Sequence, residues 1–87
     1  MTHSVTVTDE DITRGVKGMS RQCPIAHAFL RQFKLGNVMV TQVCVWDLDN
    51  PKGWNLPREA TNFIKRFDGG LPVAPITFQV DDSRIQV

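Results

Sequence analysis

Two short amphipathic helix patterns, separated by a stretch rich in β-branched residues, most strongly limit the folds open to this chain. Apolar residues recur at helical spacing after Pro24 and again after Pro57. They are Ile25, Ala26, Ala28, Phe29, Leu30 and Phe33 in the first pattern, and Ala60, Phe63, Ile64 and Phe67 in the second. Because an apolar stripe must be buried against another element, both helices are expected to pack on one face of a small sheet.

Proline and glycine mark the ends of the two helices. Pro24 suits the first helical position, where its missing N–H costs nothing, and Gly36 suits the end of that helix. The second helix is expected to begin near Pro57 and to stop at Gly69. Both helices are therefore predicted to be short.

The amino-terminal region predicts a strand followed by a single turn of helix. Residues 4–8 alternate apolar and polar side chains, which is typical of a half-buried strand. Thr8 and Asp11 then have the spacing of a capping box. A short helical turn is expected over residues 9–14, ending at Gly15.

The remaining segments predict further strands. The stretch 37–49 is rich in β-branched residues and is long enough for one strand, straight or bent. Residues 50–53 carry Pro and Gly where a type I turn favours them, so residues 54–56 should return as a short hairpin partner. The segment 74–80 is the last predicted strand.

These segments predict a single α+β domain over residues 1–87. The expected order is β-α-β-β-α-β, with a small, mainly antiparallel sheet and two helices on one face. Residues 1–3 and 81–87 are expected to be frayed ends. A domain of this size buries little surface, so a homodimer is the candidate assembly.

Composition and charge favour a soluble protein of a reducing cytosol. The chain is 41% hydrophobic and 22% charged, without an apolar run of membrane-spanning length or a signal peptide. Its two cysteines are too few for a secreted disulfide scaffold. A net charge of +1 argues against general DNA binding. We therefore expect a cytoplasmic location and no direct contact with DNA or membrane.

A run without acidic residues, 12–46, suggests a candidate anion site at the start of the first long helix. Helix amino termini attract negative charge, and basic residues precede this one. The candidate anion- or ligand-binding residues are Arg14, Lys17, Arg21, Cys23 and Ile25. The alternative is that these cations are solvated and neutralised by the acids at 9–11.

The first long helix also carries a candidate basic contact stripe, formed by His27, Arg31 and Lys34. Cys23 lies one turn before His27, and a Cys–His pair at this spacing could form a thiol nucleophile. However, no residue is placed to orient the imidazole. A capping, half-buried cysteine is the favoured interpretation. The chain lacks CxxC and HxxxH pairs, so neither a metal site nor a cofactor is predicted.

The segment WDLDNPKGW suggests a second contact surface. Trp46 and Trp54 flank the expected turn, and Asp47 and Asp49 accompany them. The two indoles could stack on each other as a cross-strand pair, clamp a base, or anchor a protein partner. The two acids would suit a basic partner.

Three motifs resemble a family of small proteins encoded by bacteriophages and prophages. They are VTVTDEDITRGVKG, CPIAHAF and LPREATNFIKRFDGGLPVAPITFQV, which cover both ends of the chain and leave out residues 38–55. The resemblance implies a phage origin and a bacterial host cytosol. Small phage accessory proteins of this kind act against host defences, by blocking a nuclease complex or by holding a nucleotide signal.

The leading hypothesis is therefore a non-catalytic counter-defence protein that binds and blocks a host defence component, such as a CRISPR-type nuclease complex. The first alternative is a sponge that sequesters an anionic nucleotide signal. The second is a small regulator associated with nucleic acid, against which the low net charge argues.

Overall fold

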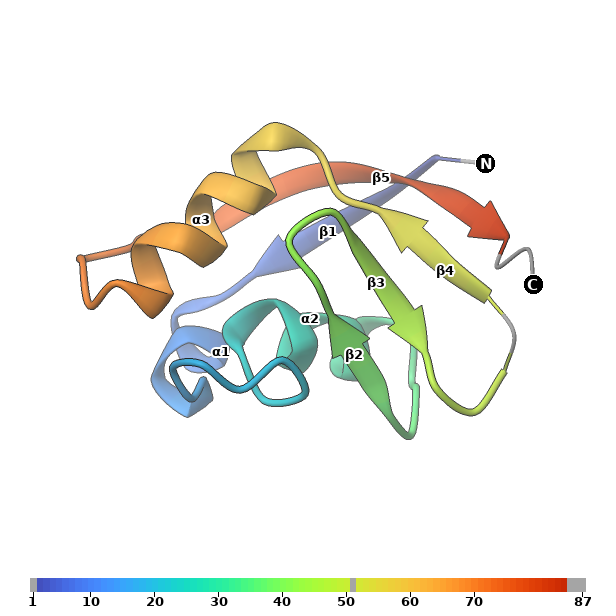
Figure 1. Ribbon diagram of the computed structural model, residues 1–87, viewed down its shortest axis with the longest axis horizontal. Coiled ribbons are helices and arrows are strands. Elements are labelled where there is room, and N and C mark those ends of the chain that lie inside the picture. Colours follow the sequence, from blue (N-terminus) through green and yellow to red (C-terminus); the bar gives the residue numbers. More distant parts are fainter. Residues whose placement is uncertain (1, 51, 85–87) are drawn as a thin grey trace.

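The computed structural model describes residues 2–50 and 52–84 and has an α+β fold built on one five-stranded antiparallel sheet (Figure 1). The fold class predicted from the sequence is confirmed. In chain order the elements are β1 (Thr2–Val7), α1 (Asp9–Arg14), α2 (Pro24–Gln32), β2 (Val38–Val40), β3 (Cys44–Asp47), β4 (Lys52–Asn55), α3 (Arg58–Asp68) and β5 (Ile76–Arg84).

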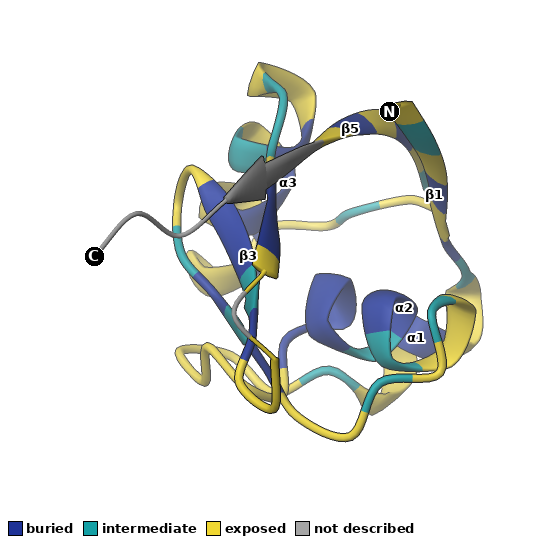
Figure 2. Ribbon diagram, turned by 90° about the vertical axis from the view of Figure 1, so that its right-hand side faces the viewer, coloured by how far each residue is buried: buried dark blue, intermediate teal, exposed yellow. Residues whose placement is uncertain are grey.

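The sheet has the order β1-β5-β4-β3-β2, and each neighbouring pair is antiparallel. The long strand β5 joins its two halves, since residues 76–81 pair with β1 and residues 81–84 pair with β4. The sheet arches over α2, which contacts both edge strands, β1 and β2 (Figure 2). Helix α3 lies at one end of this arch (Figure 1).

A single hydrophobic core fills the arch. The apolar stripes predicted for the two longer helices pack there, with Leu30 and Phe33 only partly buried, and meet the inward side chains of all five strands. The strand residues of this core are Val5, Val7, Val38, Val40, Val45, Trp54, Phe78 and Val80. The helix patterns thus identified the core-facing residues correctly.

The stretch 37–49 is a hairpin of two strands, so the prediction of one straight or bent strand is wrong. The reversal occurs at Thr41, whose hydroxyl oxygen accepts hydrogen bonds from the N–H groups of Val43 and Cys44 at 3.3 and 3.0 Å. The Thr41 N–H in turn donates to the Cys44 carbonyl at 2.8 Å. A threonine side chain therefore makes the turn where no glycine or proline marked it.

Most of the expected frayed ends belong to the sheet. Thr2 and His3 pair with Asp81 and Val80, and β5 continues to Arg84. The prediction is therefore wrong for residues 2–3 and 81–84, while residues 1 and 85–87 lie outside the described residues, as does Pro51 of the predicted turn. The predicted return strand is confirmed as β4.

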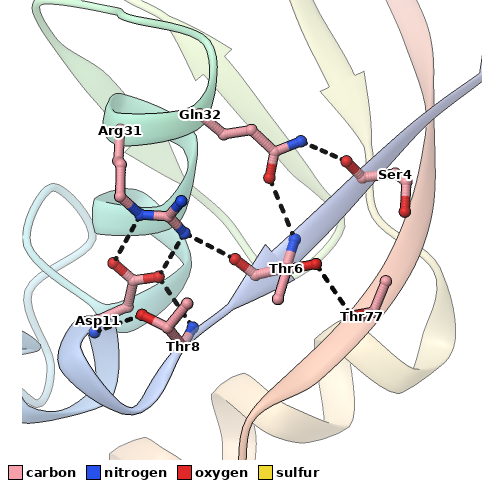
Figure 3. Close-up of polar contacts among 7 residues, drawn as sticks. All are labelled: Ser4, Thr6, Thr8, Asp11, Arg31, Gln32 and Thr77. Carbon is pink, nitrogen blue, oxygen red and sulfur yellow. Dashed lines mark hydrogen bonds and ion pairs between the residues drawn. The ribbon is translucent and has the colours of Figure 1, made fainter.

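Both edges of the sheet are covered by other parts of the chain. On β1, the Thr6 N–H donates to Gln32 Oε1 at 3.2 Å, and Arg31 Nη2 donates to the Thr6 carbonyl at 2.9 Å (Figure 3). On β2, the Val40 N–H donates to the Ser20 carbonyl at 2.8 Å. These contacts oppose edge-to-edge pairing with another chain.

Candidate functional site

The three cations of the expected anion site do not converge. Arg14 forms an ion pair with Glu10 at 2.7 Å, one turn away on α1. Lys17 Nζ lies beside Gly70, after α3. Arg21 Nη2 donates a hydrogen bond to Asn37 Oδ1 at 3.3 Å, in the turn that precedes β2. Each cation is thus directed at a different segment, and the predicted cluster is not formed.

The start of α2 is buried and not open to an anion. Cys23 is 5% exposed and Ile25 is fully buried. The Pro24 ring packs so closely on Gly15 that a Cβ there would lie 2.5 Å from Pro24 Cδ. The prediction of an anion site at Cys23 and Ile25 is therefore wrong, because both residues are buried in the hydrophobic core.

Cys23 occupies the N-cap position of α2, as predicted, but its side chain makes no capping hydrogen bond, and it is buried and not half-buried. Burial raises the pKa of its thiol, while the nearby backbone N–H groups of Ala26 and Ile25 act in the opposite direction. A thiol held in this way is poor in the nucleophilic thiolate form.

The basic stripe predicted for the first long helix is not a uniform contact surface, since α2 ends at Gln32 and Lys34 lies beyond it with a φ of 56°. Arg31 is engaged by Asp11, with Arg31 Nη2 lying 2.9 Å from Asp11 Oδ2 (Figure 3). His27 is partly buried and Lys34 is exposed. Arg31 is exposed, as expected, but its ion pair ties α2 to α1, and its role as a partner contact stays a prediction.

Trp54 belongs to the core and cannot form the expected contact pair with Trp46. It is 3% exposed, and its ring lies 5.1 Å from the Phe33 ring and 5.3 Å from the Phe29 ring, measured between centroids. In the register of β3 and β4, Trp54 is opposite Val45, and Trp46 is opposite Gly53. The two indoles therefore project from opposite faces of the sheet.

The two acids beside these tryptophans also differ. Asp47 is 2% exposed and accepts hydrogen bonds from the Asp49 N–H at 3.0 Å and from Asn50 Nδ2 at 3.2 Å. It shapes the turn between β3 and β4, so its prediction as a contact residue is wrong. Asp49 is exposed, and its Oδ1 accepts from Asn37 Nδ2 at 3.3 Å.

Trp46 is the one of the two predicted tryptophan contacts that lies outside the core. It is partly exposed on the face of the sheet opposite the core, where Met39 lies across from it on β2. The indole covers Gly53, since a Cβ on Gly53 would lie 2.4 Å from Trp46 Cε3. We call Trp46, Met39 and Gly53 the Trp46 surface. Sequence reasoning missed the role of Gly53, although a glycine inside a strand signals close approach of another group.

A hollow of about 460 Å³ lies between the loop that precedes α2 and the turn that precedes β2. We call it the Arg21 hollow, because Arg21 is the charged residue among those that line it. Its lining residues are Gly18, Met19, Ser20, Arg21, Gln22, Leu30, Gly36, Asn37 and Val38. Of the residues predicted to bind a ligand, only Arg21 lines this hollow. Gly36, which the sequence indicated as the end of the first long helix, also lines it.

Among residues 2–50 and 52–84, no group of three or more His, Cys, Asp or Glu side chains is placed to hold a metal ion. In the same part of the chain, none of the helices is both long and apolar enough to cross a membrane. Comparisons of the chain with protein-family models, curated proteins and solved structures found no match.

Proposed function

We propose that this protein is a non-catalytic binding protein of phage origin that occupies a component of the bacterial host's defence in the cytosol and blocks it. The resemblance of its amino- and carboxy-terminal motifs to phage-encoded proteins supports the phage setting. The Trp46 surface supports binding as the mode of action. The two lines of support are independent of each other.

The observation that carries the proposal is the position of Trp46. Tryptophan is a frequent anchor of protein interfaces because one side chain buries a large area at a small entropic cost. Here the indole lies across Gly53 and not in the core, although the core of this small domain holds Trp54. A tryptophan outside the core contributes less to the stability of the fold than a buried one. We therefore infer that Trp46 acts in binding.

The outer face of the sheet favours a protein partner. Farther along this face from Trp46, where β5 pairs with β1, exposed polar residues extend it, among them Thr6, Thr77 and Gln79. An aromatic anchor with a polar, hydrogen-bonding surround is the usual anatomy of a protein–protein interface. We therefore place the partner across the outer face of the sheet.

Phage plating tests this function. Host strains that each carry one defence system are infected with and without expression of the protein, and we expect plating to be restored on at least one strain. Trp46→Ala should lose this restoration, whereas Leu71→Ala, which truncates another exposed apolar residue after α3, should keep it. No restoration on any strain, or equal restoration by folded Trp46→Ala, would contradict the proposal.

A further inference from the structure

We propose that the Arg21 hollow is a binding site for a small organic anion that carries one phosphate or carboxylate group and an apolar body. The Arg21 guanidinium would hold the anionic group, and the side chains of Met19 and Leu30 would contact the apolar body. This inference is independent of the protein partner proposed above, because the hollow and the Trp46 surface involve different residues.

The loop that forms one wall of the hollow is fixed on both sides. The Val16 N–H donates to the Gln22 carbonyl at 2.8 Å and closes the loop on itself. The Gly18 N–H donates to Asp68 Oδ1 of α3 at 3.1 Å, while the Ser20 carbonyl accepts from the Val40 N–H of β2. The wall is therefore built before a ligand arrives, which lowers the ordering cost of binding.

The charge of Arg21 is not neutralised by an ion pair with any residue that the structure describes. Its guanidinium donates to the neutral side-chain oxygen of Asn37 at 3.3 Å. Arg14 and Arg31, in contrast, are both paired with carboxylates. Arg21 therefore retains the capacity to bind an external anion, and a guanidinium binds carboxylate or phosphate with two parallel hydrogen bonds.

The other groups at the hollow define the ligand further. Ser20, Gln22 and Asn37 can donate neutral hydrogen bonds, and Met19 and Leu30 add apolar surface. Asp49 accepts a hydrogen bond from Asn37, and its carboxylate lies beside Gly36. Its negative charge would repel a second anionic group of a ligand at this end of the hollow. A volume of about 460 Å³ accepts a ligand with one aromatic ring and one anionic group.

Nuclear magnetic resonance titration of the full-length, ¹⁵N-labelled protein tests the site. Phenyl phosphate, benzoate and inorganic phosphate are added separately at matched ionic strength. We expect phenyl phosphate or benzoate to shift the amide signals of residues 18–22 and 36–38, and whichever binds tighter identifies the anionic group. Inorganic phosphate should bind at least about tenfold more weakly, because it lacks the apolar body. No saturable shift with either organic anion would overturn the proposal.

Three charge variants separate this site from general attraction to basic residues. Arg21→Gln should abolish the saturable shifts, whereas Lys17→Gln, which removes a charge from the same loop but outside the hollow, should leave the affinity within about twofold. Asp49→Asn should strengthen binding about two- to fivefold, because it removes the opposing charge. Equal losses in Arg21→Gln and Lys17→Gln, or retained binding in Arg21→Gln, would show nonspecific attraction and refute the site.

Discussion

Arg31 Nη2 lies 2.9 Å from Asp11 Oδ2 and also 2.9 Å from the Thr6 carbonyl oxygen, so one guanidinium joins α1, α2 and the edge strand β1 (Figure 3). Asp11 completes the arrangement, because its carboxylate accepts from the Thr8 N–H at 2.9 Å and its own N–H is capped by the Thr8 hydroxyl at 3.2 Å. The capping box that the sequence indicated is thus part of a larger polar network.

Asp11→Ala should destabilise the protein. The substitution removes a buried carboxylate that accepts hydrogen bonds from Arg31 and from the Thr8 backbone. We expect a loss of about 2–3 kcal/mol in the free energy of unfolding, measured by urea denaturation. Arg14→Ala is the control, since its ion pair with Glu10 is exposed and contributes less than about 1 kcal/mol. Equal effects of the two substitutions would contradict this role of Asp11.

The same carboxylate predicts a pH dependence of stability. Burial alone would raise the pKa of Asp11, but hydrogen bonds from Arg31 and Thr8 outweigh burial and hold the pKa below its ordinary value. A lowered folded-state pKa means that the stabilisation is complete above the unfolded value of about 4 and is lost as the pH falls through the folded value. The stability difference between the protein and its Asp11→Asn variant should therefore shrink below about pH 4, as measured by urea unfolding across pH. A difference that stays constant there would contradict the assignment.

The two tryptophans should respond differently to truncation. Trp54→Ala removes a ring that packs on Phe29 and Phe33, so we expect a loss of about 3–5 kcal/mol. Trp46→Ala removes a partly exposed ring and should cost less than about 2 kcal/mol. Thermal unfolding followed by circular dichroism measures the loss of stability in both variants. A larger loss for Trp46→Ala than for Trp54→Ala would show that Trp46, and not Trp54, faces the core.

The thiol of Cys23 should resist modification in the folded protein. The side chain is 5% exposed, and burial raises the pKa of its thiol. In a Cys44→Ala background, iodoacetamide at pH 8 should label Cys23 at least about a hundredfold more slowly than the urea-unfolded chain. Labelling at a similar rate in the folded and unfolded states would contradict the buried position of Cys23 and would be consistent with a nucleophilic thiol.

The helices and the core could be predicted from the sequence because both depend on local spacing. The stripes after Pro24 and Pro57 lie where helical periodicity placed them, and both are buried. The hairpin within residues 37–49 could not be predicted in this way, since its turn depends on hydrogen bonds of the Thr41 side chain.

The candidate site was only partly predictable because it depends on strand register and long-range contacts. The register places Trp46 opposite Gly53 and Trp54 opposite Val45, and a shift of one residue would have exchanged their faces. Arg31 lies on the surface as predicted, but its ion pair was missed because its partner Asp11 lies on another helix. Local patterns identify an arginine or a tryptophan as a candidate, but the tertiary fold decides what it contacts.

Binding between the purified protein and the defence component identified by phage plating shows whether the outer face of the sheet is the binding surface. Isothermal titration calorimetry compares the unmodified protein with the Trp46→Ala and Leu71→Ala variants, each verified as folded. We expect Trp46→Ala to weaken the affinity about thirtyfold or more, as for an interface anchor, while Leu71→Ala binds like the unmodified protein. Unchanged affinity of Trp46→Ala would show that the outer face of the sheet is not the binding surface.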